Sequence, residues 1–250
     1  MSRVSARTLV LDFDGTVCVG DGPVLLYAEE VARRTGLDIR DGVAHFLRTG
    51  RLPRDDTPTP ATTHAPEDGY QAVVALAYAA ARRGGSPLLD GTLLHAAYLA
   101  SRARFADDGA GTSPPEGLHA FLDRMRASRT RVVLVTNSPL TGVADWLERH
   151  GTGSLVDDVV PDAGKPAAMS AILRALLSGT GAVPDTLVSV GDVHANDIAP
   201  ALAIGACGAH IDRWASRPGR ATWSAPAFDG LFEPLVAWSS GEKMSIESVL

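Results

Sequence analysis

The sequence predicts an α/β fold, in which helices cover both faces of a parallel β-sheet. Three short apolar runs carry this prediction, at residues 8–13, 131–135 and 186–190, and each is followed by a segment whose apolar residues have helical spacing. Near-continuous apolar strands that alternate with helices are typical of a parallel sheet whose two faces are both buried. Weaker runs at 155–160 and 208–211 are predicted as further strands.

Four helices are predicted around these strands, because apolar residues recur every three or four positions along one helix face. The first follows the pair Pro114-Pro115, and the other three each end at a glycine, a residue that is common at helix C-termini. The four patterns span 118–125, 140–147, 169–176 and 198–202. The stretch 214–238 is predicted to return as a strand or loop and to finish in a helix.

A second, smaller lobe is predicted within residues 20–113, where alternating strands and helices give way to helices alone. Its helical patterns cover 24–35, 70–83 and 90–105, and the Pro- and Thr-rich stretch 51–69 is predicted as a loop. A chain of 250 residues is long enough for a main domain with an added lobe. We therefore expect an α/β core domain formed by 1–19 and 114–250, with a helical domain at 20–113 inserted after the first strand.

The composition argues against several classes of protein. Apolar residues make up 45% and charged residues 21% of the chain, as in ordinary globular proteins. The formal net charge of −6 gives no electrostatic reason to expect nucleic acid or an anionic membrane as a partner. No apolar run approaches the roughly 20 residues of a membrane span, and the basic N-terminus leads into a strand without a signal-peptide core. The two cysteines, Cys18 and Cys207, fit a reducing, cytoplasmic location.

The first predicted strand ends in the sequence Asp12-Phe13-Asp14-Gly15-Thr16. Successive side chains of a strand point to opposite faces, so Asp12 and Asp14 share a face if the extended conformation continues. Two carboxylates at the end of a buried strand repel each other and lose hydration, and a bound metal ion relieves both effects. The alternative interpretation is a strand that ends in a solvated turn, because Asp-Gly is a common turn pair.

Polar side chains also follow the later strands. They are Thr136 and Asn137 after the second strand, Lys165 just before a helix, and Asp192 and Asp197 after the third clear strand. The carboxyl ends of parallel strands meet at one edge of a sheet, so we expect these groups to converge there. The set offers carboxylates for Mg²⁺, a lysine for an anion, and a hydroxyl with backbone amides for oxygen atoms. Such a site suits phosphoryl transfer, which requires charge neutralisation and alignment.

In these motifs and their order, the sequence resembles the haloacid dehalogenase-like (HAD) hydrolase superfamily, most of whose members are phosphatases. The matching motifs are Asp12-Phe13-Asp14-Gly15-Thr16, Thr136-Asn137, Lys165-Pro166 and Gly191-Asp192-Val193-His194-Ala195-Asn196-Asp197. The matching core elements span 8–20 and 114–211, and the helical insertion lies where this family has its cap of the first type, C1. The resemblance implies a Rossmann-like core with a helical cap domain.

The resemblance also implies a catalytic role for the first motif. Asp12 is the expected nucleophile, which attacks phosphorus to give an aspartyl-phosphate. Asp14 is the expected acid for the leaving oxygen and then the base for the hydrolytic water. The expected Mg²⁺ ligands are Asp12, Asp14 through its backbone carbonyl, and Asp192.

The remaining motif residues are expected to bind the phosphoryl group and to support the site. The resemblance implies that Thr136 and the Asn137 amide bind phosphoryl oxygens, that Lys165 neutralises charge near Asp12, and that Asp197 orients Lys165 or a metal-bound water. Each also has a plainer interpretation. The Thr136-Asn137-Ser138 segment resembles a helix N-cap, Lys165 a surface lysine, and Asp197 a residue that opens the next helix. His194 is interpreted as a solvent-facing loop residue.

The leading functional hypothesis is therefore a Mg²⁺-dependent phosphatase of a small phosphorylated metabolite. Dehalogenases of this family typically lack the second acid of the first motif and need no metal, so the presence of Asp14 counts against that activity. A phosphomutase with the same acids is an alternative, and so is a regulatory protein that binds a phosphorylated ligand without catalysis. The protein is expected to be a monomer or a homodimer.

Overall fold

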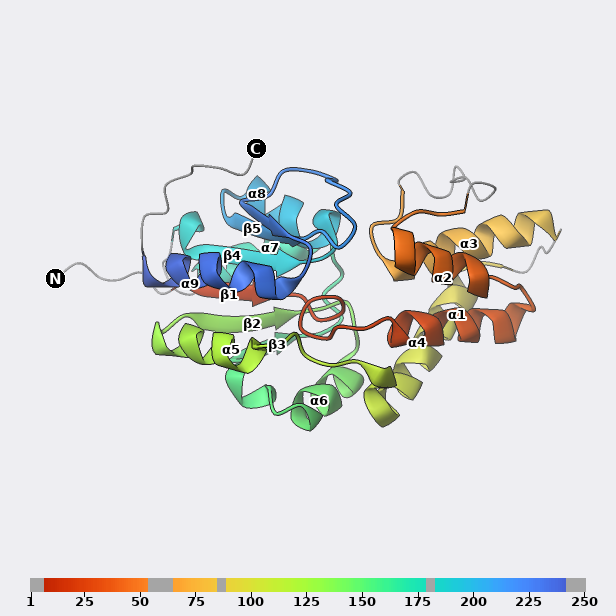
Figure 1. Cartoon of the computed structure of the whole chain (residues 1–250), viewed down its shortest axis with the longest axis horizontal. Helices are drawn as coiled ribbons and strands as arrows, with labels where there is room; N and C mark the ends of the chain where they lie inside the picture. Colours follow the sequence, from red (N-terminus) through yellow and green to blue (C-terminus); the bar gives the residue numbers. More distant parts are fainter. Residues whose placement is uncertain (1–6, 54–64, 85–88, 179–182, 242–250) are drawn as a thin grey trace. The chain divides into compact units, whose positions relative to one another are not determined.

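The computed structural model describes residues 7–53, 65–84, 89–178 and 183–241. The chain divides into two compact units, which Figure 1 shows with their elements labelled. An α/β unit comprises Met1–Val17, Pro114–Asn137 and His150–Leu250, and a helical unit comprises Cys18–Ser113 and Ser138–Arg149. The larger segment of the helical unit, Cys18–Ser113, is thus inserted after the first strand, and its second segment follows the second strand.

The α/β unit is built on a six-stranded sheet with the order β3-β2-β1-β4-β5-β6, and every neighbouring pair is parallel. The strands are β1 (Thr8–Leu11), β2 (Arg131–Val135), β3 (Asp158–Val160), β4 (Leu187–Gly191), β5 (Cys207–Ile211) and β6 (Trp223–Ala225). The predicted fold class is confirmed. The strand order changes direction between β1 and β4, and in open α/β sheets ligands bind outside the carboxyl ends of the strands at such a switch point.

Helices cover both faces of this sheet (Figure 1). On one face, Met169 and Leu173 of α7 (Met169–Ser178) and Ala201 of α8 (Ala199–Ala203) pack against strand residues such as Val10 and Val133. On the other face, α5 (Leu118–Ala127) packs with α9 (Phe232–Ser240), and the rings of Phe121 and Phe232 stack with centroids 4.4 Å apart. All four residues of β1 are buried, which is why the strand is apolar without alternation.

The helical unit has its own apolar core. Its helices are α1 (Gly22–Thr35), α2 (Arg40–Thr49), α3 (Gly69–Arg83), α4 (Gly91–Asp108) and α6 (Leu140–Arg149). Val31, Val43, Val73 and Ala97 are completely buried in this core. The helix α2 was not predicted, because it contributes only a few core residues over ten positions, and no side chain caps its first turn.

The sequence assigns residues 138–149 to the α/β domain, but the structure groups them with the helical unit. The reason is the close packing of α6 on residues from the 20–113 insertion. Gly142 has no side chain, and a Cβ there would lie 3.1 Å from the Phe105 ring. The indole Nε1 of Trp146 donates a hydrogen bond to Thr112 Oγ1 at 2.8 Å. The predicted loop at 51–69 lies largely outside the described residues.

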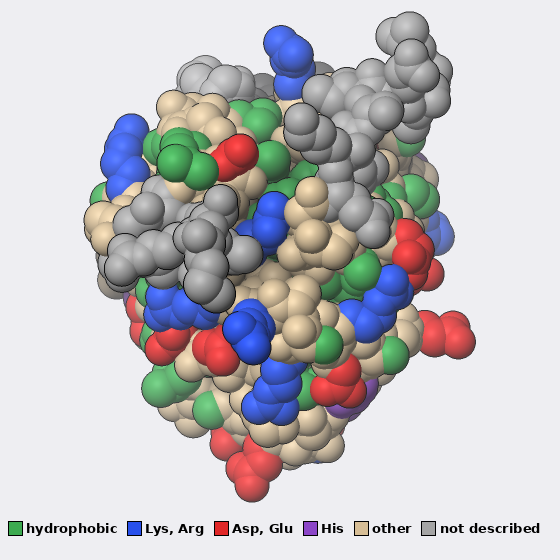
Figure 2. Space-filling view, turned by 90° about the vertical axis from the view of Figure 1, so that its left-hand side faces the viewer, with side chains coloured by type: hydrophobic (Ala, Val, Ile, Leu, Met, Phe, Trp, Pro, Cys, Tyr) green, Lys and Arg blue, Asp and Glu red, His purple; other side chains and the backbone are tan. Residues whose placement is uncertain are grey.

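The surface carries charges of both signs. Figure 2 shows acidic and basic side chains interspersed over one face. In the α/β unit, exposed ion pairs join Arg124 to Glu233 and Arg131 to Asp158, an arrangement that contributes little to stability in water. No helix within the described ranges has the length and apolar character needed to cross a membrane.

Candidate active site

The structure brings Asp12, Lys165 and Asp197 into direct contact at the carboxyl edge of the sheet. The Lys165 Nζ donates one hydrogen bond to Asp12 Oδ1 and another to Asp197 Oδ1, each at 2.7 Å. Only 2% of the lysine side chain and 1% of the Asp197 side chain are exposed. The surface-lysine interpretation of Lys165 is therefore wrong, because this ammonium is buried between two carboxylates.

The loop that carries Lys165 is held by the end of β2. The Asn137 Nδ2 donates to the Lys165 carbonyl at 3.0 Å, and the Lys165 backbone N–H donates back to Asn137 Oδ1 at 2.7 Å. The Thr136 carbonyl accepts from the backbone N–H of Ala163 at 2.9 Å. The second motif thus holds the third in place through two hydrogen bonds, and a further one holds Ala163 just before it. The role of Thr136 and Asn137 in binding phosphoryl oxygens stays a prediction.

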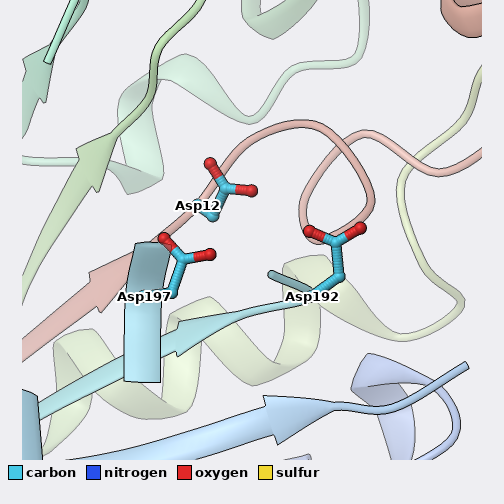
Figure 3. Close-up of side chains that lie close together, drawn as sticks. All are labelled: Asp12, Asp192 and Asp197. Atoms are coloured by element: carbon cyan, nitrogen blue, oxygen red, sulfur yellow. The ribbon is translucent and has the colours of Figure 1, made fainter. Parts of the chain in front are cut away.

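Asp192 completes a group of three carboxylates. Ligand oxygens of Asp12, Asp192 and Asp197 all lie within 4.8 Å of one another, although they come from different parts of the chain. Figure 3 shows Asp12 just beyond β1, Asp192 just beyond β4, and Asp197 on the helical turn that follows. That turn, His194–Ile198, is a single turn of π-helix, a form that often occurs at functional sites.

Two glycines leave the space that these carboxylates occupy. A Cβ on Gly191 would lie 2.3 Å from Asp197 Oδ2, and a Cβ on Gly15 would lie 2.2 Å from Asp192 Oδ2. Gly15 also has a φ of +79°, in the left-handed region that favours glycine. The glycines of the first and fourth motifs therefore allow the acids to approach one another.

Burial disfavours the ionised forms of Asp12 and Asp197. It raises the pKa of Asp197 to about 7, and the nearby charge of Asp12 adds to this effect while Lys165 opposes it. Burial also raises the pKa of Asp12, against the opposing charge of Lys165. For the Lys165 ammonium, burial lowers the pKa, but the charges of Asp12 and Asp197 outweigh burial and the pKa is raised. Lys165 is thus a permanent cation in the site.

The site fits a divalent cation. Three carboxyl groups share one ammonium, so the group has excess negative charge whenever more than one of them is ionised. The buried Asp197 Oδ2 has no hydrogen-bond partner among the described residues, although buried polar atoms normally have one. Closely spaced carboxylate oxygens are the donors that Mg²⁺ prefers. A bound cation would satisfy both the unpartnered oxygen and the excess charge.

Comparison with solved structures identifies the fold. A predicted phosphoglycolate phosphatase from Haemophilus somnus aligns with 94% of this chain and 100% of its own at a TM-score of 0.67 and 14% identity. An HAD hydrolase of Bacillus subtilis, bound to magnesium, aligns with 92% of this chain and 98% of its own, with a TM-score of 0.59 and 16% identity. An L-2-haloacid dehalogenase aligns with 93% and 99%, with a TM-score of 0.55 and 16% identity.

The chain has the haloacid dehalogenase-like fold. No family model matches the chain, and no curated protein matches its sequence. The similarity therefore lies in the three-dimensional arrangement of the chain. Because structures with this fold include both phosphatases and dehalogenases, the fold by itself leaves the reaction open.

Within this haloacid dehalogenase-like fold, the regular strand that carries Asp12 towards the site ends before Asp14. The strand β1 ends at Leu11, and the chain then turns, since the backbone N–H groups of Thr16 and Val17 both donate to the Phe13 carbonyl. A turn therefore begins at Phe13, and that Asp12 and Asp14 share a face stays a prediction. Asp14 is half-buried and near enough to Asp12 to raise the pKa of that carboxyl. Its catalytic and metal-binding roles stay predictions.

Sequence reasoning did not predict that His210 packs against the backbone of Asp192, or that His194 packs against His210. Gly191 and His210 are register partners on β4 and β5, and the buried His210 ring contacts the Asp192 backbone. The available signal was a histidine within the predicted strand 208–211, close to its carboxyl end, where the polar groups of the other strands gather. His194 was expected to face solvent, but it is only partly exposed and its ring packs against His210.

Proposed function

We propose that this protein is a Mg²⁺-dependent hydrolase of phosphomonoesters, which acts on a small phosphorylated metabolite through an aspartyl-phosphate at Asp12. The observation that carries the proposal is the group of three carboxylates around the buried ion pair between Lys165 and Asp12. A nucleophilic carboxylate such as Asp12 could be held in place by one cation alone, and Lys165 already supplies that cation. Asp197 also binds Lys165, and the further carboxylate of Asp192 beside this pair supports a bound metal ion, because Mg²⁺ prefers closely spaced carboxylate oxygens.

The names of the structural relatives support the same reaction. One structural relative is described as a predicted phosphoglycolate phosphatase, and another was solved with magnesium bound. Relatives described as dehalogenases have the same fold, so the choice between the two reactions depends on the residues of this chain. Asp14 supports the phosphatase, because it supplies the acid that a phosphate ester's leaving oxygen requires.

In the proposed mechanism, Asp12, Asp192 and the Asp14 carbonyl would hold Mg²⁺, with the Asp197 carboxylate close to Asp12 and Asp192. When bound, the ion neutralises charge on the phosphoryl oxygens. The Asp12 carboxylate attacks phosphorus and the bond from phosphorus to the ester oxygen breaks, while Asp14 donates its proton to that oxygen. A water molecule then gives a proton to Asp14 and attacks phosphorus, which releases phosphate and restores the Asp12 carboxylate.

Lys165 has two tasks in this scheme. Its ammonium remains charged, so it stabilises the ionised form of Asp12 and keeps one carboxylate oxygen in a fixed direction. The same cation lies where negative charge accumulates on the transferred group. Asn137 supports both tasks, because its two hydrogen bonds fix the backbone of Lys165.

The experiment is a substrate panel assayed with the purified full chain. The panel contains p-nitrophenyl phosphate, phosphoglycolate, sugar phosphates, nucleoside monophosphates and 2-chloropropionate, each with Mg²⁺ or with EDTA. We expect phosphate release from at least one phosphomonoester with Mg²⁺, its loss with EDTA, and no halide release. Asp12→Asn serves as the control, and it is expected to abolish turnover in a folded protein. Halide release without a metal requirement, or an active Asp12→Asn protein, contradicts the proposal.

A further inference from the structure

A buried histidine lies directly against the backbone of one candidate metal ligand. His210, on β5, is 3% exposed, and its Nε2 lies 3.2 Å from the Asp192 carbonyl oxygen. A carbonyl oxygen can only accept a hydrogen bond, so the His210 Nε2 carries the hydrogen and donates it. The Nε2 side of the His210 ring therefore faces the Asp192 backbone.

A second histidine supports the first. The rings of His194 and His210 form an edge-to-face pair, with centroids 5.5 Å apart and planes at 84°. The His194 Nε2 donates to the Arg220 carbonyl at 2.9 Å. A Cβ on Gly219 would lie 2.3 Å from the His194 ring, so the absence of a side chain there lets the backbone pack against the imidazole. His194 is thus fixed between His210 and the segment 219–220.

That segment belongs to a loop with a defined structure. At the end of β5, the Asp212 carboxylate accepts hydrogen bonds from the backbone N–H groups of Ser216 and Arg217, both at 2.8 Å. The Thr222 backbone N–H donates to the Gly208 carbonyl at 2.8 Å, which ties the far end of the loop to β5. The loop therefore forms a fixed support for His194.

The Asp192 residue is confined from two directions as a result. Its carbonyl is held by His210, and its carboxylate lies against Gly15, where a Cβ would come within 2.2 Å of Oδ2. A carboxylate that binds a metal must be aimed within a small tolerance, and the groups behind the ligands provide that aim. A hydrogen bond to the Asp192 carbonyl fixes the backbone from which the side chain extends, and contact with Gly15 limits where the carboxylate can lie.

From this arrangement we propose that His210, backed by His194, is a positioning residue that fixes Asp192 in the orientation required for Mg²⁺ binding. The inference rests on the proposed function, because it assumes that Asp192 binds the metal. It assigns no proton transfer to either histidine. His210 is buried and donates its Nε2 hydrogen to the Asp192 carbonyl, so the proposed effect on the metal site passes through Asp192.

Two substitutions separate the hydrogen bond from the packing of the ring. His210→Phe keeps an aromatic ring beside His194 and removes the donor, whereas His210→Gln keeps an N–H donor near the position of Nε2 and loses the ring. The matched control is His119→Phe. His119 Nε2 also lies 2.9 Å from a backbone carbonyl, that of His150, but it is exposed and belongs to α5.

The measurement is the Mg²⁺ dissociation constant of each full-length protein, determined by titration calorimetry without substrate, with urea unfolding in EDTA as the measure of folding. We expect His210→Phe to weaken Mg²⁺ binding about 10-fold. His210→Gln and His119→Phe are expected to bind Mg²⁺ within about two-fold of the unchanged protein, since both leave an N–H donor available to Asp192. If His210→Phe is too unstable to titrate, His210→Leu replaces it.

The outcomes distinguish this inference from the proposed function. If the unchanged protein binds Mg²⁺ and His210→Phe binds it equally well, the positioning role is refuted and the proposed function stands. If His210→Gln loses as much affinity as His210→Phe, ring packing rather than the hydrogen bond sets the affinity, and the inference is again refuted. If the unchanged protein neither binds Mg²⁺ nor hydrolyses phosphomonoesters, the proposed function fails and the inference fails with it.

Discussion

Gly191→Ala tests whether the space beside Asp197 is required by the site. The added Cβ would lie 2.3 Å from both the Cγ and Oδ2 of Asp197, whereas ordinary van der Waals contact begins near 3.4 Å. Something must therefore move by about 1 Å, and the β4 backbone on either side is fixed by β1 and β5. The φ of Gly191 is not in the left-handed region, so alanine is compatible with the backbone itself.

The expected movement is that of the Asp197 carboxylate away from Lys165. Overpacking of this kind costs about 1–3 kcal/mol of unfolding free energy. A displacement of about 1 Å at a catalytic group reduces turnover on the order of 100-fold. We therefore expect Gly191→Ala to lose activity by that factor, to lose that amount of stability, and to bind Mg²⁺ more weakly.

The assays are urea unfolding in EDTA and Mg²⁺-dependent hydrolysis of the best substrate from the panel. Gly91→Ala is the matched control, because a Cβ there meets nothing within 4 Å, and its stability should change by less than about 0.5 kcal/mol. In an Asp197→Gly background the clash is removed, so the cost of Gly191→Ala should fall towards zero. Full activity and unchanged stability in Gly191→Ala would refute the reasoning.

Two further predictions concern the charges of the site. Lys165→Met removes the cation between two buried carboxylates, so we expect a loss of about 3–5 kcal/mol in unfolding free energy near neutral pH and a loss of turnover, measured by urea unfolding and the phosphatase assay. A stable and active Lys165→Met protein contradicts this. Burial raises the pKa of Asp197 from 3.8 to about 7, so between these pH values the folded protein keeps a proton that the unfolded chain releases. In EDTA, the unfolding free energy should therefore fall by up to about 4 kcal/mol as the pH rises from about 4 to about 7. Asp197→Asn should reduce this slope, and an identical slope in both proteins argues against the assignment.

Much of the α/β unit could be predicted from the sequence, because its strands are buried on both faces and so are apolar without interruption. The expected strand at 131–135 coincides with β2, and that at 186–190 differs from β4 by one residue at each end. The short strand β3 is half-exposed, and its weaker apolar signal made its start uncertain by three residues. Periodicity reports burial, so it locates best the elements that are fully buried.

The convergence of Asp12, Lys165 and Asp197 also followed from the sequence. Parallel strands bring their carboxyl ends to one edge, which turns a sequence separation of 153 residues between Asp12 and Lys165 into a hydrogen bond. The turn after Leu11 did not follow, because local hydrogen bonds to the Phe13 carbonyl override the alternation expected of a strand. The grouping of α6 with the helical unit was not predicted either, because it depends on the close packing of Gly142 against the Phe105 ring.

The hydrogen bond between His210 and Asp192 could not be predicted from the sequence either, because it depends on how two strands pair. The pairing of β5 with β4 sets Gly191 opposite His210, and only this register brings the imidazole beneath the Asp192 carbonyl. A sequence pattern gives the type of residue at a strand end. It does not give the register of that strand against its neighbour, which decides which backbone group the side chain reaches.

The most direct test of the account is the mass of the Asp12 peptide after the enzyme is quenched with acid during turnover. With Mg²⁺ and a phosphomonoester substrate, we predict an added phosphoryl group on the peptide that contains Asp12, absent with EDTA and absent in Asp12→Asn. A phosphoryl group on another residue, or turnover by Asp12→Asn at the unchanged rate, would contradict the central claim that Asp12 is the nucleophile.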